Sequence, residues 1–90
     1  MEDALPGGDL VTQGLEDLSK GLVSVPSLLV SIGAQRLARS GVEVPSPWPS
    51  PEERLYELLA SEGSDTAHAR YNALVRRLVS FERAVECARA

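Results

Sequence analysis

The sequence predicts an all-α protein, a bundle or array of four helices joined by short turns. Three observations lead to this expectation. Apolar residues recur at three- and four-residue steps along most of the chain, Gly, Pro and Ser mark the ends of these segments, and no β-strand pattern is longer than residues 42–44. The length of 90 residues fits one helical domain, residues 1–90, with a thin core.

The first helix is expected over residues 10–20, with Asp9 as its N-cap and Gly21 at its end. Gly14 lies inside this segment and weakens it, but a glycine there is also suited to a close crossing with another helix. We expect residues 1–8, which precede this helix, to form a flexible N-terminus.

The second helix is expected to start at Ser24 or Val25, with Pro26 in its first turn, where a missing N–H costs nothing. It runs to about Arg39 and ends at Gly41. Because it is apolar nearly all round, we expect it to be the central and most buried helix.

Residues 42–50 form a proline-rich connector, the crossover between the second and third helices. Its prolines stand at every second position, which fixes φ and favours an extended backbone. Trp48, the only tryptophan, lies among them. The segment is either a displayed ligand for an aromatic groove or a rigid strap in which Trp48 fills a gap between helices. We favour the strap, because the chain has few other aromatic side chains for its core.

The third helix is expected to begin with Ser50 as N-cap, Pro51 in the first turn and Glu53 completing a capping box, and to end near Gly63. The fourth and longest helix is expected to start after a cap at Ser64 or Asp65. Its apolar residues form a seam with alternating steps of four and three, at Ala67, Tyr71, Leu74, Leu78, Phe81, Val85 and Ala88.

This seam, widened by Val75 and Val79, should pack against the second helix. It is longer than the other helices can cover at once, so we expect its remaining apolar face to bind a second copy or a helical protein partner. The sequence therefore predicts a small non-enzymatic interaction or assembly module that self-associates through this helix. The expected interface residues are Arg70, Leu74, Val75, Arg77, Leu78, Val79, Phe81 and Val85.

Arg70 and Arg77 flank the seam. They are expected either to act as rim charges that set the orientation of a partner or to pair with carboxylates of a neighbouring helix.

Charge bears on a second possible function, that of a small regulatory protein associated with nucleic acid. Residues 1–63 hold ten acids and four bases, net −6, and residues 64–90 hold three acids and five bases, net +2, which sums to −4. The third and fourth helices could form a helix-turn-helix that presents Arg70, Arg76 and Arg77 to phosphates. The negative net charge argues against this function, because nucleic-acid binding needs a concentrated positive surface.

A third possible function is a helical enzyme subunit or ligand-binding domain. His68, Tyr71 and Asn72 share a face at spacings i, i+3 and i+4, and Arg70 is close in sequence, so His68, Arg70, Tyr71 and Asn72 could bind a ligand. The simpler interpretation is an exposed histidine beside a core tyrosine.

We expect no catalytic residues, cofactor or metal site. Cys87 and His68 stand nineteen residues apart on one expected helix, about 28 Å, which is too far for a catalytic pair. Glu53/Glu57 and Glu82/Glu86 are i, i+4 pairs, but the Glu-x-x-His motif of helical metal sites does not occur in the sequence.

Membrane insertion is not expected either. The acidic N-terminus lacks the basic and apolar regions of a signal peptide. The longest uncharged stretch, between Lys20 and Arg36, has about 15 residues where a bilayer span needs about 20. We therefore expect a cytoplasmic protein with no membrane contact.

Overall fold

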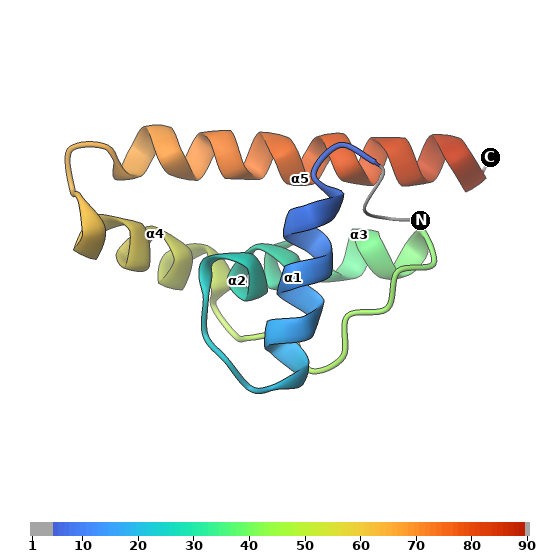
Figure 1. Ribbon diagram of the computed structural model, residues 1–90, viewed down its shortest axis with the longest axis horizontal. Coiled ribbons are helices and arrows are strands. Elements are labelled where there is room, and N and C mark those ends of the chain that lie inside the picture. The colour runs from blue at the N-terminus through green and yellow to red at the C-terminus, as the bar shows by residue number, and fades with distance from the viewer. Residues whose placement is uncertain (1–4, 90) are drawn as a thin grey trace.

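The computed structural model, described for residues 5–89, is all-α as the sequence predicts. Its helices are α1 (Gly8–Ser19), α2 (Val25–Ile32), α3 (Ala34–Arg39), α4 (Pro51–Glu62) and α5 (Ala67–Arg89). Figure 1 shows α5 as a long rod along one side of the molecule, with α4 and α3 beneath its two halves and α1 crossing between them. Within the described residues there is no strand.

The close crossing expected at Gly14 is confirmed. A Cβ atom at this position would collide with the carbonyl oxygen of Pro26 and lie 2.7 Å from Cγ1 of Val30. Only glycine therefore lets the backbones of α1 and α2 approach this closely.

The expected start of α2 is also confirmed, and its cap has a reciprocal form. Oγ of Ser24 accepts a hydrogen bond from the backbone N–H of Ser27 at 3.2 Å, and Oγ of Ser27 accepts one from the backbone N–H of Ser24 at 2.9 Å. Pro26 lies in the first turn. Two otherwise unpaired N–H groups are satisfied in this way, so the most apolar helix begins at a fixed residue.

The expected second helix is wrong in one respect, because it is divided into α2 and α3 at Gly33. The described residues therefore contain five helices in place of the four expected. A Cβ on Gly33 would lie 2.7 Å from Oε2 of Glu82 and 3.1 Å from both Cδ atoms of Leu78. These side chains of α5 leave little room for a side chain at residue 33, and a glycine weakens the helix at that point.

The central position expected for α2 agrees with the burial of its side chains. Leu28, Leu29 and Val30 have no exposed surface. The contacts of α2 with α1 and α4 are more extensive than those with α5, so the expected principal pairing of α2 with the C-terminal helix is not found.

Side chains from every helix and from the connector form one hydrophobic core. Its buried members are Val11, Leu18, Leu28, Leu29, Val30, Leu37, Val42, Val44, Leu55, Leu59, Ala67, Leu78, Phe81 and Val85.

Two of the expected N-caps differ from the structure, and a third lacks its hydrogen bonds. The N-cap of α1 is Gly7, and Asp9 lies inside the helix. Ser50 is the N-cap of α4, as expected, but it is in the left-handed conformation (φ 48°) and its hydroxyl makes no cap hydrogen bond, so the expected capping box with Glu53 is absent. The last helix starts at Ala67, after a turn in which the N–H of Thr66 donates to the carbonyl of Gly63 at 3.2 Å.

The expectation of a flexible N-terminus stays a prediction, since residues 1–4 lie outside the described residues. Leu5, the first that is described, packs against the core. No helix in the described part of the chain is both long enough and apolar enough to cross a membrane.

Candidate functional site

Three of the residues expected at an interface are buried by the chain itself. Leu78, Phe81 and Val85 on α5 are 3%, 0% and 3% exposed and belong to the core. In this fold they stabilise the protein and are not available to a partner, so any contact surface on α5 must lie to one side of the predicted seam.

The two arginines that flank the seam have carboxylate partners on neighbouring helices, which was one of the two roles expected for them. Nη1 of Arg70 lies 2.9 Å from Oε1 of Glu62 on α4, and Nη2 of Arg77 lies 3.0 Å from Oδ1 of Asp9 on α1. These exposed ion pairs link α5 to the two helices beneath it, although each contributes little stability.

The other expected interface residues on α5 are half-buried. Leu74 packs against the core, whereas Val75 and Val79 are not among the residues that do so. Val75 and Val79 are therefore apolar side chains of α5 that the core leaves partly uncovered.

Two tyrosines extend this apolar surface onto α4. The rings of Tyr56 on α4 and Tyr71 on α5 have centroids 5.8 Å apart and planes inclined by 56°. Tyr56 is 40% exposed, and Tyr71, Val75 and Val79 follow one another at four-residue steps along one side of α5. We refer to Tyr56, Tyr71, Val75 and Val79 as the tyrosine–valine strip.

Charged side chains of opposite sign border the strip. On α4, Glu53 and Glu57 lie next to Tyr56 at spacings of three and one, and both are exposed. On α5, Arg76 and Arg83 lie one helical turn before and one turn after Val79, on the side of the helix away from the core, and both are exposed. Among the side chains that the structure describes, none of these four forms an ion pair, so the strip has an acidic end, on α4, and a basic end, towards the C-terminus of α5.

The residues expected to bind a ligand are only partly brought together. His68 and Asn72 are in contact, with 3.2 Å between Nε2 and Nδ2. Tyr71 faces Tyr56, and Arg70 reaches Glu62 on another side of the helix. Arg70 is therefore engaged away from His68 and Asn72, and ligand binding at this face stays a prediction.

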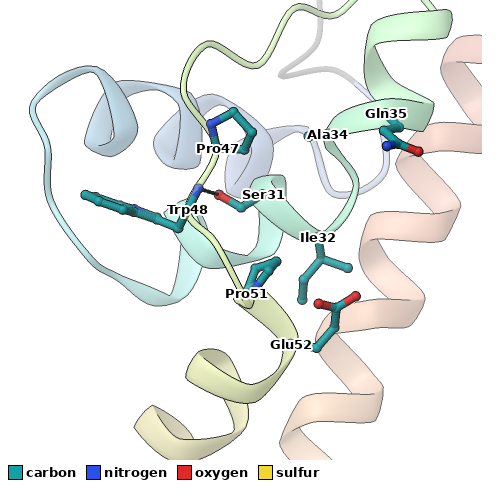
Figure 2. Close-up of a pocket in the computed structure, with 8 residues that line it drawn as sticks. All are labelled: Ser31, Ile32, Ala34, Gln35, Pro47, Trp48, Pro51 and Glu52. Atoms are coloured by element: carbon teal, nitrogen blue, oxygen red, sulfur yellow. Dashed lines mark hydrogen bonds between the residues drawn. The ribbon is translucent and has the colours of Figure 1, made fainter.

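A pocket of about 360 Å³ lies where α2 ends, α3 and α4 begin and the connector passes between them (Figure 2). We call it the Trp48 pocket; its lining residues are Ser31, Ile32, Ala34, Gln35, Pro47, Trp48, Pro51 and Glu52. In Figure 2, Gln35, Ile32 and Glu52 stand on the side nearest α5, and Pro47 and Trp48 stand on the opposite side.

Trp48 is half-buried and is attached to α2 by two hydrogen bonds. Its backbone N–H donates to Oγ of Ser31 at 2.9 Å, and its indole Nε1–H donates to Oγ of Ser27 at 3.3 Å. The guanidinium of Arg54 lies 5.3 Å from the ring centroid, a cation–π distance. This wall of the pocket is therefore fixed in position.

The connector backbone departs from the extended form expected for it. Ser46 has φ 52° and Ser50 has φ 48°, both left-handed. Each costs about 1–2 kcal/mol for a residue other than glycine, and the strain is accepted where the chain must turn along α2 and into α4.

A cluster of charges joins α3 to the far end of α5. Nε of Arg36 lies 2.7 Å from Oε2 of Glu86, Nη2 of Arg36 lies 3.0 Å from Oε1 of Glu86, and Nη1 lies 3.3 Å from Oε1 of Glu82. The hydrogen bonds from Arg36 lower the pKa of Glu86. Burial raises the pKa of Glu82, and Arg36 opposes this change. These ion pairs connect α3 to α5, so the simplest role of the cluster is structural.

No group of His, Cys, Asp and Glu side chains in the described part of the chain is arranged to hold a metal ion. Cys87 is a free and exposed thiol on α5.

Comparisons of the chain with models of protein families, with curated proteins and with solved structures gave no match. A proposal for the function therefore has to start from the two surfaces described above, the tyrosine–valine strip and the Trp48 pocket.

The sequence did not predict Tyr56, Gln35 or Glu52 as site residues, because each belongs to a surface formed by residues distant in the chain. One signal was present in the sequence: two serines at i and i+4, Ser27 and Ser31, stand in an otherwise apolar helix, which indicates that another segment is hydrogen-bonded to the helix there.

Proposed function

We propose that the protein is a small non-enzymatic interaction module that assembles with a second copy of itself through the tyrosine–valine strip. The position of Val75 and Val79 is the observation that carries the proposal. They are half-buried on α5 without packing against the core, so a partner surface would remove further apolar area from water. Tyr56 adds an exposed ring of the kind enriched at interfaces.

The charges at the two ends of the strip support a symmetric pair. A two-fold axis that crosses the strip at its middle exchanges the ends, so Glu53 and Glu57 of one copy come opposite Arg76 and Arg83 of the other, and the same contact is made twice. Opposite charges at the rim favour this orientation and oppose the reversed one. In this proposal Arg76 and Arg83 take the rim role that the sequence suggested for Arg70 and Arg77, which already have partners.

The proposal is tested by placing a charge in the middle of the strip. We expect the unmodified chain to show the mass of a dimer by light scattering as its concentration rises from about 10 µM to about 1 mM. Val79→Glu should remain monomeric over this range, because a carboxylate would be desolvated in the contact.

The matched control is Ser80→Glu, which introduces the same group at the next, exposed position on a different side of α5. It should dimerise like the unmodified chain, and circular dichroism should show all three proteins folded. The proposal is wrong if the unmodified chain stays monomeric throughout, or if Val79→Glu and Ser80→Glu behave alike.

A further inference from the structure

We propose that the Trp48 pocket binds the side chain of a lysine or arginine carried by an extended segment of a partner protein. This inference does not depend on self-association, because the pocket and the tyrosine–valine strip share no residue.

The walls of the pocket suit the aliphatic part of such a side chain. Pro47, Pro51, Ile32 and Ala34 present apolar groups around it. A volume of about 360 Å³ lies at the lower end of the roughly 300–1,000 Å³ of small-molecule sites, so it admits one long side chain with a little backbone. The stems of Lys and Arg pack along apolar surfaces while their charged ends remain at a polar edge.

One edge of the pocket is suited to a positive charge. Glu52 is the only ionisable side chain among the residues that line it, and in the described part of the chain its exposed carboxylate forms no ion pair. Gln35 is an exposed amide farther along the pocket, and in Figure 2 Ile32 lies between it and Glu52. A guanidinium or ammonium group could therefore pair with Glu52.

The surroundings favour a cation over an anion. Pro51, the first residue of α4, has no N–H to donate to a negative group. The hydroxyl of Ser31 already donates to the carbonyl of Ser27 at 2.8 Å. Arg54, whose guanidinium lies over the Trp48 ring, does not line the pocket, so Glu52 supplies the only formal charge of its lining. The complementary partner segment is therefore basic.

The pocket is also formed before any ligand arrives. The two hydrogen bonds to α2 hold Trp48, and the rings of Pro47 and Pro51 are rigid. Little conformational entropy remains to be lost by the protein on binding, which favours recognition of even a single side chain.

Titration of the ¹⁵N-labelled chain with the peptide acetyl-Ala-Ala-Arg-Ala-Ala-amide tests the proposal by NMR. We expect saturable shifts at the backbone amide of Trp48 and the side-chain amide of Gln35, with a dissociation constant on the order of 1 mM. Glu52→Gln should weaken binding about tenfold, because it removes the charge-assisted pair. Glu43→Gln removes an exposed acid of the connector that does not line the pocket and should leave the affinity unchanged.

Two further ligands decide what the pocket recognises. The same peptide with norleucine in place of arginine keeps the stem without the charge and should bind at least about fivefold more weakly. Butylammonium should also bind more weakly than the arginine peptide, since it lacks the flanking backbone. Equal binding of the norleucine peptide overturns the role of charge, and equal binding of butylammonium overturns a partner segment as the occupant. Equal affinity of Glu52→Gln and the unmodified chain also rejects the proposal.

Repeating the titration with Val79→Glu separates this result from the proposed function. That substitution lies outside the pocket and should leave peptide affinity unchanged whether or not the chain dimerises.

Discussion

The backbone N–H of Trp48 donates a hydrogen bond to Oγ of Ser31 at 2.9 Å, across seventeen positions of the chain. A second bond, from the indole N–H of Trp48 to Oγ of Ser27, follows one helical turn away. Polar pairs therefore hold the connector on α2, the most apolar helix, and they do so at the wall of the Trp48 pocket.

Ser31→Ala removes the acceptor of Trp48 and leaves the N–H of a half-buried residue without that partner. We expect the free energy of unfolding to fall by about 1–3 kcal/mol, the cost of an unsatisfied buried donor. Urea unfolding followed by the fluorescence of the only tryptophan measures the change. Ser80→Ala, at an exposed position of α5, should change stability by less than about 0.5 kcal/mol. Equal stabilities of the two variants would show that the hydrogen bond does not hold the connector.

Phe81 and Val79 lie on the same helix, but we assign one to the core and the other to a contact surface. Phe81→Ala should lower the free energy of unfolding by about 3–5 kcal/mol, because it leaves a cavity in a fully buried site. Val79→Ala should cost less than about 1 kcal/mol when measured in dilute, monomeric protein. Chemical denaturation of both variants checks the assignment, and a larger loss for Val79→Ala contradicts it.

Gly14→Ala tests the crossing of α1 over α2. The added methyl group meets the backbone carbonyl of Pro26, which has little freedom to move, so we expect a loss of about 1–3 kcal/mol in unfolding free energy. Gly63→Ala is the control, because its nearest neighbour would be the side-chain oxygen of Thr66 at 3.2 Å and its φ of 171° is open to any residue. Thermal melts in which Gly14→Ala is as stable as Gly63→Ala would refute the close crossing.

Asp17 makes the stability depend on pH. Hydrogen bonds from Ser24 at 2.7 Å and from Gln13 at 2.8 Å lower the pKa of its carboxyl below the ordinary 3.8. A pKa lower in the folded state than in the unfolded state stabilises the protein above about pH 4, and this contribution is lost as the pH falls through the lowered value. Asp17→Asn should therefore be less stable at neutral pH and lose less stability on acidification.

Melting temperatures measured by circular dichroism in steps from neutral to acidic pH test this prediction. Asp65→Asn, at an exposed acid in the turn before α5, should keep the acid sensitivity of the unmodified chain. Glu82 contributes with the opposite sign, because its raised pKa makes the folded state bind a proton first and gain stability as the pH falls. An unchanged acid slope in Asp17→Asn would contradict the role given to its hydrogen bonds.

Local chemistry made part of this fold predictable from the sequence. The cap at Ser24, with Pro26 in the first turn, depends on residues adjacent in the chain, so the local sequence is enough to predict the start of α2. Gly14 was also informative, because a glycine weakens a helix but suits a close crossing of two helices. The break at Gly33 was not predicted, since the apolar pattern continues through it and the side chains that crowd residue 33, Leu78 and Glu82, belong to a distant helix.

The candidate site was less predictable than the fold. Helix lengths suggested that Leu78, Phe81 and Val85 would be left uncovered, but all three are buried. Gly7, at the start of α1, lies close to Phe81, and Gly33, between α2 and α3, lies close to Leu78. Which apolar side chains of a helix become buried depends on the angles at which the other helices cross it, and the spacing of apolar residues does not predict these angles. The contact of Tyr56 with Tyr71 likewise depends on how α4 lies against α5.

Exchanging the charges at the two ends of the strip decides whether two copies assemble through it. One variant carries Arg76→Glu and Arg83→Glu, and a second carries Glu53→Lys and Glu57→Lys. Each should be monomeric alone, because like charges then face each other across the two-fold axis. Sedimentation equilibrium of an equimolar mixture should give the mass of a 1:1 heterodimer. A mixture that stays monomeric, or single variants that dimerise as the unmodified chain does, would show that the chain does not assemble in this way.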